Sequence, residues 1–266
     1  MKNMYKLFYF ALVMMVGCVE YHPYDTRIYG DKGINAKNIA RIEQACRGRE
    51  SLRFAVVSDS QRWYDELENA VEVINGRDDV DFVIHAGDLS DFGMRAEFEA
   101  QRDILNKLNV PYVCLIGNHD CIATGKDVFA TIFGTADMSF IAGNVKFICL
   151  NTNALEYDNG QAVPDVAFVE QELSVIPKGV EKSVVAMHAQ PFSDQFYDEG
   201  VAHILQQKFT KLPDLQFCIH GHGHRYKEED IFGDGVMYYE CDNVGDRSLL
   251  IFTLDEDGYE CEKIDF

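Results

Sequence analysis

Short apolar runs alternate with longer amphipathic stretches along the first half of the chain. Residues 63–75 and 94–108 carry apolar side chains at the spacing of one helical face, and a short helix is predicted over 36–47. The apolar runs between them predict strands over 52–59, 81–88 and 110–118. Strands that alternate with amphipathic helices indicate βαβ units and a largely parallel sheet.

The second half of the chain has a different pattern. Residues 138–153 predict a β-hairpin with Gly143 and Asn144 at its turn. A helix is expected over 165–174, and further strands are expected over 182–190 and 215–224. Residues 236–265 predict three short strands, with turns over 243–246 and 255–258. We therefore expect two β-sheets packed face to face, the second more antiparallel, with helices outside.

The first 18 residues are typical of an export signal. Lys2 and Lys6 precede residues 7–16, an apolar run that is too short to span a bilayer. Gly17 and Cys18 follow, and this order resembles a bacterial lipoprotein signal in which Cys18 is lipidated. An ordinary signal peptide cut nearby, or an uncleaved anchor, is the alternative.

The resemblance to a lipoprotein implies an order of segments and a location. We expect residues 1–17 to be a signal peptide, 18–35 a tether and 36–266 the folded domain. The protein would be exported and lipid-anchored to a bacterial membrane, either in the periplasm or at the cell surface. The membrane would be reached through this N-terminal lipid anchor only.

Composition narrows the classes of partner. The chain has 266 residues, is 47% hydrophobic and carries a net charge of −20. This acidity excludes nucleic acid bound through a basic face, because phosphate backbones need clustered lysine and arginine. Cys241 and Cys261 lie in strand-like segments and could pair, and no CxxC motif is present to suggest a zinc ribbon.

The residues able to carry chemistry follow the ends of the predicted strands. Ligands of open α/β sheets bind beyond the carboxyl ends of the strands, so these residues should share one rim. Carboxylate, amide and imidazole groups suit Zn, Mn or Fe. Each residue alone could be a turn or capping residue, but together they predict a two-metal site bridged by Asp88, of the kind that clamps a phosphoryl group. The rim residues are Asp59, Gln61, Asp88, Asn118, His119, Asp120, His188, His222 and His224.

The order of these residues resembles the motifs of the calcineurin-like metallophosphoesterases. The matching stretches are Asp-Ser-Gln at 59–61, Gly-Asp-Leu-Ser-Asp at 87–91, Gly-Asn-His-Asp at 117–120, His188, and Gly-His-Gly-His at 221–224. The resemblance implies an α/β fold, a four-layer α/β/β/α sandwich of two mixed β-sheets flanked by helices. It also implies a phosphomonoesterase or phosphodiesterase that cleaves a small phosphoester by attack of a metal-bridging hydroxide.

The resemblance implies a role for each motif residue. Two divalent or trivalent metal ions, Mn, Zn or Fe, would be bound. One ion would be held by Asp59, Gln61, Asp88 and His224, and the other by Asp88, Asn118, His188 and His222. His119 would face the leaving-group oxygen as an acid, Asp120 would orient His119, and Asp91 would act from outside the ligand set.

Gln61 departs from the pattern, because the family usually has histidine there, so the first motif is a DxQ variant. Its amide is a neutral and weaker ligand than imidazole, and we expect looser binding at the first metal with a preference for Mn²⁺. An exposed loop amide is the alternative for Gln61. A further hypothesis is a catalytically weakened, metal-binding surface lipoprotein that serves as a binding or scaffold module, although the retained His119 argues against it.

Three features near the motifs have open interpretations. Arg62 either contacts a phosphate or is a surface residue at a helix start. His85 is expected to be a core or interface histidine. Four aromatic residues of two loops either line a substrate cleft or pack the loops: Tyr157, Phe192, Phe196 and Tyr197.

Overall fold

The computed structural model describes residue 22 and residues 24–158, 160–196 and 198–266. Cys18, the expected signal peptide and Tyr197 therefore lie outside the described residues. Over the described ranges, no helix is long and apolar enough to cross a membrane. The seven cysteines that the structure describes, Cys241 and Cys261 among them, are free thiols.

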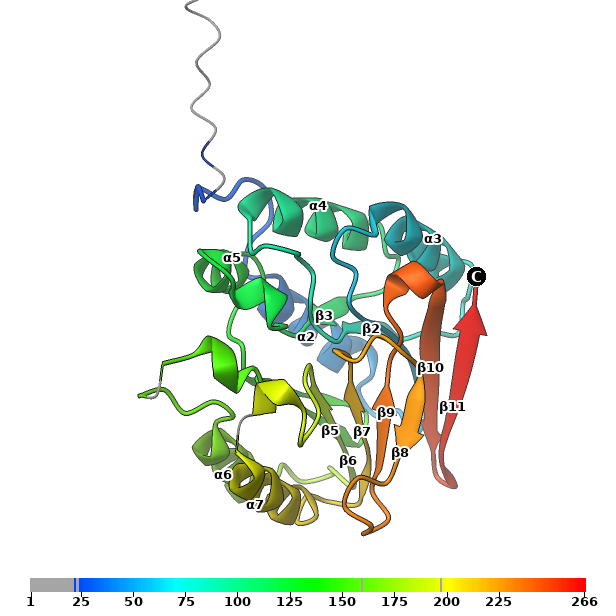
Figure 1. Ribbon diagram of the computed structural model, residues 1–266. Helices are drawn as coiled ribbons and strands as arrows, with labels where there is room; N and C mark the ends of the chain where they lie inside the picture. Colours follow the sequence, from blue (N-terminus) through cyan, green and yellow to red (C-terminus); the bar gives the residue numbers. More distant parts are fainter. Residues whose placement is uncertain (1–21, 23, 159, 197) are drawn as a thin grey trace, which may run out of the picture.

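Two mixed β-sheets lie at the centre of the molecule (Figure 1). The first sheet has the order β11-β10-β1-β2-β3, with β1, β2 and β3 parallel and β10 antiparallel to β1. Its strands are β1 (Leu52–Val57), β2 (Phe82–His85), β3 (Tyr112–Cys114), β10 (Ser248–Asp255) and β11 (Gly258–Asp265).

The second sheet has the order β4-β5-β6-β7-β9-β8. Strands β5, β6, β7 and β9 are parallel, and β4 and β8 pair antiparallel at the two edges. Its strands are β4 (Met138–Ala142), β5 (Val145–Leu150), β6 (Lys182–Met187), β7 (Leu215–His220), β8 (Lys227–Glu229) and β9 (Met237–Glu240).

Helices cover the outer faces of both sheets, as the apolar stripes predict (Figure 1). Leu67, Phe98 and Phe129 pack helices onto the first sheet, and Val169 and Leu205 pack helices onto the second. The expected four-layer α/β/β/α sandwich is confirmed. The helices are α2 (Ile34–Ala45), α3 (Tyr64–Asn75), α4 (Arg95–Leu105), α5 (Gly125–Ile132), α6 (Val166–Ser174) and α7 (Glu199–Phe209).

Aromatic side chains fill the space between the two sheets. The rings of Phe217 and Phe252 stack across the interface at 4.4 Å between centroids, and Phe54 meets Phe147 edge to face at 5.3 Å. All four side chains are buried. Because such ring pairs have defined geometries, they set how one sheet lies on the other. The strand ends of both sheets are thereby brought to one rim.

Helix α2 covers the edge of the first sheet. Asn35 donates its amide to the Cys114 carbonyl at 2.8 Å and accepts the Cys114 N–H at 2.9 Å, while Asn38 donates to the Tyr112 carbonyl at 2.8 Å. These side chains take the place of a further strand beside β3, which would otherwise present unpaired backbone groups.

The folded domain begins earlier than residue 36. Ile28 is buried in the core cluster that α3, α4 and α5 form with the first sheet, and Arg102 of α4 donates to the Tyr29 carbonyl. The part of the expected tether that follows Ile28 therefore lies against the domain. The reason is that an apolar side chain and a buried arginine hold this segment, although its composition is typical of a linker.

The C-terminal strands divide between the two sheets, which the alternation of residues could not predict. Strand β9 joins the second sheet parallel to β7, whereas β10 and β11 form a hairpin in the first sheet. The expected turn over 255–258 lies in this hairpin, and the segment 243–246 contains a 3₁₀ turn, η4 (Val244–Asp246). The central strands of the second sheet are parallel, not antiparallel as expected.

Candidate metal centre

The site lies where strands β1, β2, β3, β6 and β7 end, and its backbone is unusual there. Five of the expected ligands have left-handed backbone conformations, with φ of 51° at Asp59, 33° at Gln61, 58° at Asp88, 74° at His222 and 55° at His224. Such angles are strained for residues other than glycine and persist only where the surrounding structure enforces them. The chain therefore turns sharply after β1, β2 and β7, and the side chains that follow separate strands converge.

The first ligand group contains the residues expected for one metal. Ligand atoms of Asp59, Asp88 and His224 all lie within 4.8 Å of one another, and Asp59 Oδ1 is 3.2 Å from His224 Nε2. The Gln61 amide nitrogen lies 3.4 Å from Asp88 Oδ2, and Gln61 is only 5% exposed. Rotating the Gln61 side-chain amide by half a turn exchanges its nitrogen and oxygen, so that the oxygen faces the group instead. Gln61 therefore belongs to the group and is not an exposed loop amide.

The second ligand group lies around the side chain of Asn118. Its Oδ1 is 3.0 Å from His188 Nε2 and 3.0 Å from His222 Nδ1, and the two imidazole rings meet edge to face. Asp88 Oδ1 lies 3.5 Å from His188 Nε2. The two oxygens of Asp88 thus face different groups, which suits a carboxylate shared between two ions.

The electrostatics of the site favour cations. Burial alone would lower the pKa of His188, but the Asp88 and Asp59 carboxylates raise that pKa to about 10. Contact with Asp59 raises the pKa of His224. Asp59 Oδ1 is buried and receives no hydrogen bond from the described residues. A buried carboxylate oxygen without a donor is costly unless a cation pairs with it, so the residues present fit metal ions.

Hydrogen bonds outside the groups orient the ligands. His188 Nδ1 lies 2.9 Å from the Ala86 carbonyl, which leaves Nε2 as the ligand atom. Asp59 Oδ2 accepts bonds from the Ser58 hydroxyl at 2.5 Å and from the His222 N–H at 3.1 Å. These contacts direct the remaining lone pairs of His188 and Asp59 toward the ligand groups.

Two glycines are required by close approach. A Cβ atom on Gly117 would overlap Asp88, and a Cβ atom on Gly221 would overlap Ser58 Oγ and crowd Asp59 Oδ2. Only glycine lets these loops pass so near the carboxylates.

Asp91 holds two other side chains at the rim. His119 Nδ1 lies 2.9 Å from the Asp91 carbonyl, so this nitrogen donates and Nε2 faces away from that contact. The Arg62 guanidinium pairs with Asp91 Oδ1 at 2.7 Å, and the Arg62 side chain is 63% exposed. One residue therefore places an imidazole and an available guanidinium beside each other.

Asp120 does not have the expected contact with the His119 ring. Its carboxylate accepts bonds from the backbone N–H groups of Ser90 at 2.8 Å and Gly117 at 2.9 Å, and from the Ser90 hydroxyl at 2.8 Å. Burial and the charge of Asp88 raise its pKa to about 7. Asp120 therefore ties the loop after β2 to the loop after β3, because its oxygens point inward to backbone donors.

A buried polar chain supports the turn that carries Gln61. Gln101 of α4 donates to the Gln61 carbonyl at 2.6 Å and accepts from the Ser60 hydroxyl at 2.9 Å, and Ser60 Oγ lies 2.8 Å from His85 Nε2. Burial lowers the pKa of His85 to about 4, which keeps this ring neutral near pH 7. His85 is a core histidine as expected, but no sequence signal marked Gln101.

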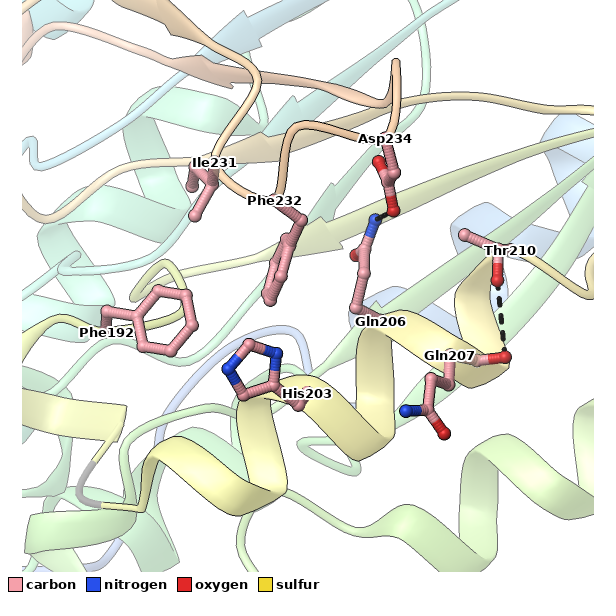
Figure 2. Close-up of a pocket in the computed structure, with 8 residues that line it drawn as sticks. All are labelled: Phe192, His203, Gln206, Gln207, Thr210, Ile231, Phe232 and Asp234. Carbon is pink, nitrogen blue, oxygen red and sulfur yellow. Dashed lines mark hydrogen bonds between the residues drawn. The ribbon is translucent and has the colours of Figure 1, made fainter.

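The loop aromatics mainly pack the loops. Phe196 is buried, and Lys126 Nζ lies 4.3 Å from the centroid of the Tyr157 ring. Phe192 lies beside His203 and Phe232 at a cavity of about 430 Å³ between α7 and the loop after β8 (Figure 2). These contacts favour the packing interpretation for the residues that the structure describes.

Comparison with known proteins gives one family and several relatives. The family described as calcineurin-like phosphoesterase matches residues 52–226. A 3′,5′-cyclic-nucleotide phosphodiesterase of Nostoc sp. is 25% identical over 182 residues, which cover 66% of this chain and 66% of that protein. The match thus spans slightly under two thirds of that relative.

Two solved structures share the fold at low identity. A dimetal phosphatase from Danio rerio has a TM-score of 0.61 and 14% identity, and the match covers 81% of this chain and 99% of that one. A purple acid phosphatase from yellow lupin has a TM-score of 0.63 and 14% identity, covering 82% of this chain and 52% of that one. Each likeness therefore covers about four fifths of this chain.

Proposed function

This chain belongs to the calcineurin-like phosphoesterase family, and we propose that it is a phosphoester hydrolase that uses two metal ions to cleave a small phosphodiester. The position of Asp88 is the main support, because its two carboxylate oxygens face separate ligand groups at 3.4 Å from the Gln61 amide and 3.5 Å from His188 Nε2. A single structural ion would not need both groups.

The geometry supports a ligand set for each ion. Asp59, Gln61 and His224 would hold one ion, Asn118, His188 and His222 the other, and Asp88 would be shared. When bound, two such ions polarise phosphoryl oxygens and lower the pKa of a coordinated water.

The proton for the leaving group would come from His119. Its Nδ1–H is occupied by the Asp91 carbonyl, so the proton at Nε2 is the one available for transfer. The backbone N–H of His119 also donates to Asp88 Oδ1 at 2.9 Å, which keeps the imidazole next to the shared carboxylate.

A phosphodiester suits the charge of the protein better than a monoester. The chain carries a net charge of −20, and Arg62 is the cation that Asp91 holds beside His119. A diester has one negative charge near neutral pH, whereas a monoester approaches two, so the diester meets less repulsion. The similarity to a cyclic-nucleotide phosphodiesterase supports the same choice.

We further propose Mn²⁺ at the first metal and an exported, lipid-anchored protein. The buried Gln61 amide would supply an oxygen ligand, which suits Mn²⁺ better than an imidazole would.

The order of Lys2, Lys6, residues 7–16 and Cys18 supports lipidation. Mass spectrometry of the membrane fraction tests it: an acylated Cys18 is expected, and a Cys18→Ser chain should be released from the membrane.

Metal dependence and substrate class can be tested together. The metal-free domain from Ile28 onward, which includes the segment packed on α4, is reloaded with Mn²⁺, Zn²⁺, Fe²⁺ or Mg²⁺ and assayed on p-nitrophenyl phosphate, bis-p-nitrophenyl phosphate and 3′,5′-cyclic AMP. We expect metal-dependent turnover, fastest on the diesters, and its loss in Asp88→Asn. Glu256→Gln is the matched control, since Glu256 is an exposed carboxylate at the far hairpin.

Two outcomes would contradict the proposal. Equal turnover by Asp88→Asn would show that the shared carboxylate is not needed. Metal binding without turnover on any phosphoester would instead support the binding-module hypothesis, with Gln61→His as the variant to examine.

A further inference from the structure

Asp194 contacts a metal-ligand candidate from outside every recognised motif. This residue lies in the loop between β6 and α7, and its Oδ1 is 2.9 Å from His222 Nε2. The other ring nitrogen of His222, Nδ1, is 3.0 Å from Asn118 Oδ1 in the second ligand group. The His222 imidazole therefore lies between a loop carboxylate and the second metal's ligands.

The contact between Asp194 and His222 can determine which ring nitrogen of His222 binds a metal. A histidine that binds a metal through Nδ1 must carry its proton on Nε2, and a carboxylate that accepts that proton fixes the tautomer and the ring rotation. His188 has the equivalent contact at its own far nitrogen, where the Ala86 carbonyl accepts from Nδ1. The two histidines of the second group are thus oriented by different acceptors.

We propose that Asp194 is a positioning residue for the second metal, whose carboxylate holds His222 as an Nδ1 ligand. This inference rests on the two-metal function proposed above. Among the described residues, the Asp194 carboxylate hydrogen-bonds with His222 Nε2 and the Gln195 N–H, so its effect on the metal would pass through His222.

The loop that carries Asp194 is anchored on both sides. Phe196 is buried in the core beneath α6 and α7. Phe192 has a left-handed backbone conformation, with φ of 65°, and its ring lies 5.3 Å from His203 and 5.2 Å from Phe232 (Figure 2). Gln195, which directly follows Asp194, donates to Glu156 Oε1 at 3.2 Å. The carboxylate is therefore held over His222 although it is 74% exposed.

An exposed ion pair contributes little to folding, so removing Asp194 should leave the fold intact and change metal binding selectively. The experiment is calorimetric titration of the metal-free protein with Mn²⁺, together with a metal count after gel filtration. The Asp194→Ala variant is expected to bind the second ion about 10–100-fold more weakly and the first ion normally. Asp194→Asn should lie between Ala and wild type, because its amide oxygen still accepts from Nε2.

Glu199→Gln is the matched control, since Glu199 is exposed at the start of α7, the helix that follows the loop of Asp194, and has no hydrogen bond or ion pair within the described part of the chain. Titration with Co²⁺ adds a spectroscopic readout, because the absorption bands of the second ion should shift in Asp194→Ala and not in Glu199→Gln.

The outcomes separate the two proposals. A wild-type protein that binds two ions, with both affinities unchanged within about twofold in Asp194→Ala, overturns the role of Asp194 alone. A wild-type protein that binds a single ion overturns the two-metal function and this inference with it. Weaker binding of the second ion in Asp194→Ala, with Glu199→Gln unaffected, supports both.

Discussion

At the scale of single residues, Asp91 and Asp120 each end a motif, but their oxygens contact different kinds of group. The Asp91 carbonyl accepts from His119 and its carboxylate pairs with Arg62. Asp120 is fully buried and accepts only from groups of neighbouring loops. The acid of the proposed reaction is therefore oriented by Asp91, and Asp120 keeps the two loops together.

His119→Asn should lower kcat by about 10²–10⁴-fold with a small change in KM, because proton donation to the leaving group is lost while the metal ligands remain. The loss should be greater for phenyl than for p-nitrophenyl esters, since a poor leaving group needs the proton more. Steady-state kinetics over a series of aryl esters measures this. An equal loss for every leaving group would show that His119 does not act as the acid.

His85 should make the stability of the metal-free protein depend on pH. Its pKa is lowered to about 4 by burial, so between that value and its ordinary pKa of 6.5 the unfolded chain binds a proton that the folded chain does not. The neutral His85 therefore makes its full contribution to stability above about pH 7, and this contribution falls as the pH drops. Urea unfolding should show a loss on the order of 2 kcal/mol from this residue by about pH 5.

His85→Gln is the variant that isolates this effect. This substitution removes the titrating group. The unfolding free energy should then differ less between about pH 7 and pH 5, by the amount attributed to His85, under the same metal-free conditions. An unchanged difference would show that other buried groups, such as His220 with its pKa of about 4, account for it.

At the scale of elements, helices complete backbone hydrogen bonding that the strands leave open. Asn35 of α2 pairs with both backbone groups of Cys114 at the edge of β3. Gln101 of α4 pairs with the Gln61 carbonyl and the Ser60 hydroxyl in the turn after β1. Buried amides on helices thus hold loop and edge conformations that the strands alone would not keep.

Gln101→Met should destabilise the protein by roughly 2–4 kcal/mol, because the Gln61 carbonyl and the Ser60 hydroxyl lose buried partners. It should also weaken binding of the first metal ion, since Gln61 is held by this turn. Urea unfolding and Mn²⁺ titration measure the two effects. Gln207→Met, an exposed glutamine on α7, is the control, and equal midpoints for both variants would contradict the role of Gln101.

At the scale of the whole molecule, the site joins the two sheets. Asp59, Asp88 and Asn118 follow strands of the first sheet, whereas His188, His222 and His224 follow strands of the second. Metal ions bound by both sets would cross-link the halves of the sandwich, in addition to the aromatic contacts between them.

Metal binding should therefore raise thermal stability. At a metal concentration about a hundred times Kd, the gain is about 2.7 kcal/mol, which corresponds to a Tm rise of roughly 5–10 °C for a chain of this size. Calorimetric melting with EDTA and with Mn²⁺ measures it. The rise should vanish in Asp88→Asn and persist in Glu256→Gln, and a rise that survives in Asp88→Asn would place the stabilising metal elsewhere.

The strands of the first half and its helices α3 and α4 were predictable because their apolar periodicity is strong, whereas α5 was not predicted. The helix predicted over 63–75 is α3, and the one predicted over 94–108 contains α4. Helix α7 was missed, although Ala202, Leu205 and Phe209 have helical spacing, because the polar Gln206 also lies on its buried face. Gln206 is buried there since Asp234 and Tyr238 satisfy its amide.

The sequence by itself determined the fold class and predicted the residues that the structure brings together in the candidate metal centre. Polar side chains at the ends of apolar strands can gather only at a common rim, and glycines such as Gly117 and Gly221 are needed where backbone passes the carboxylates. The spacing of residues within each motif was therefore enough to predict the candidate ligands.

The tertiary structure alone decided which side chains contact those candidate ligands from outside the motifs. Asp194 and Gln101 lie in segments without any motif, and they reach His222 and Gln61 because loop and helix packing brings them there. The sheet that each C-terminal strand joins was likewise set by packing between the layers. Such contacts join residues far apart in the chain, and local periodicity holds no information about them because it reports only which face of an element is buried.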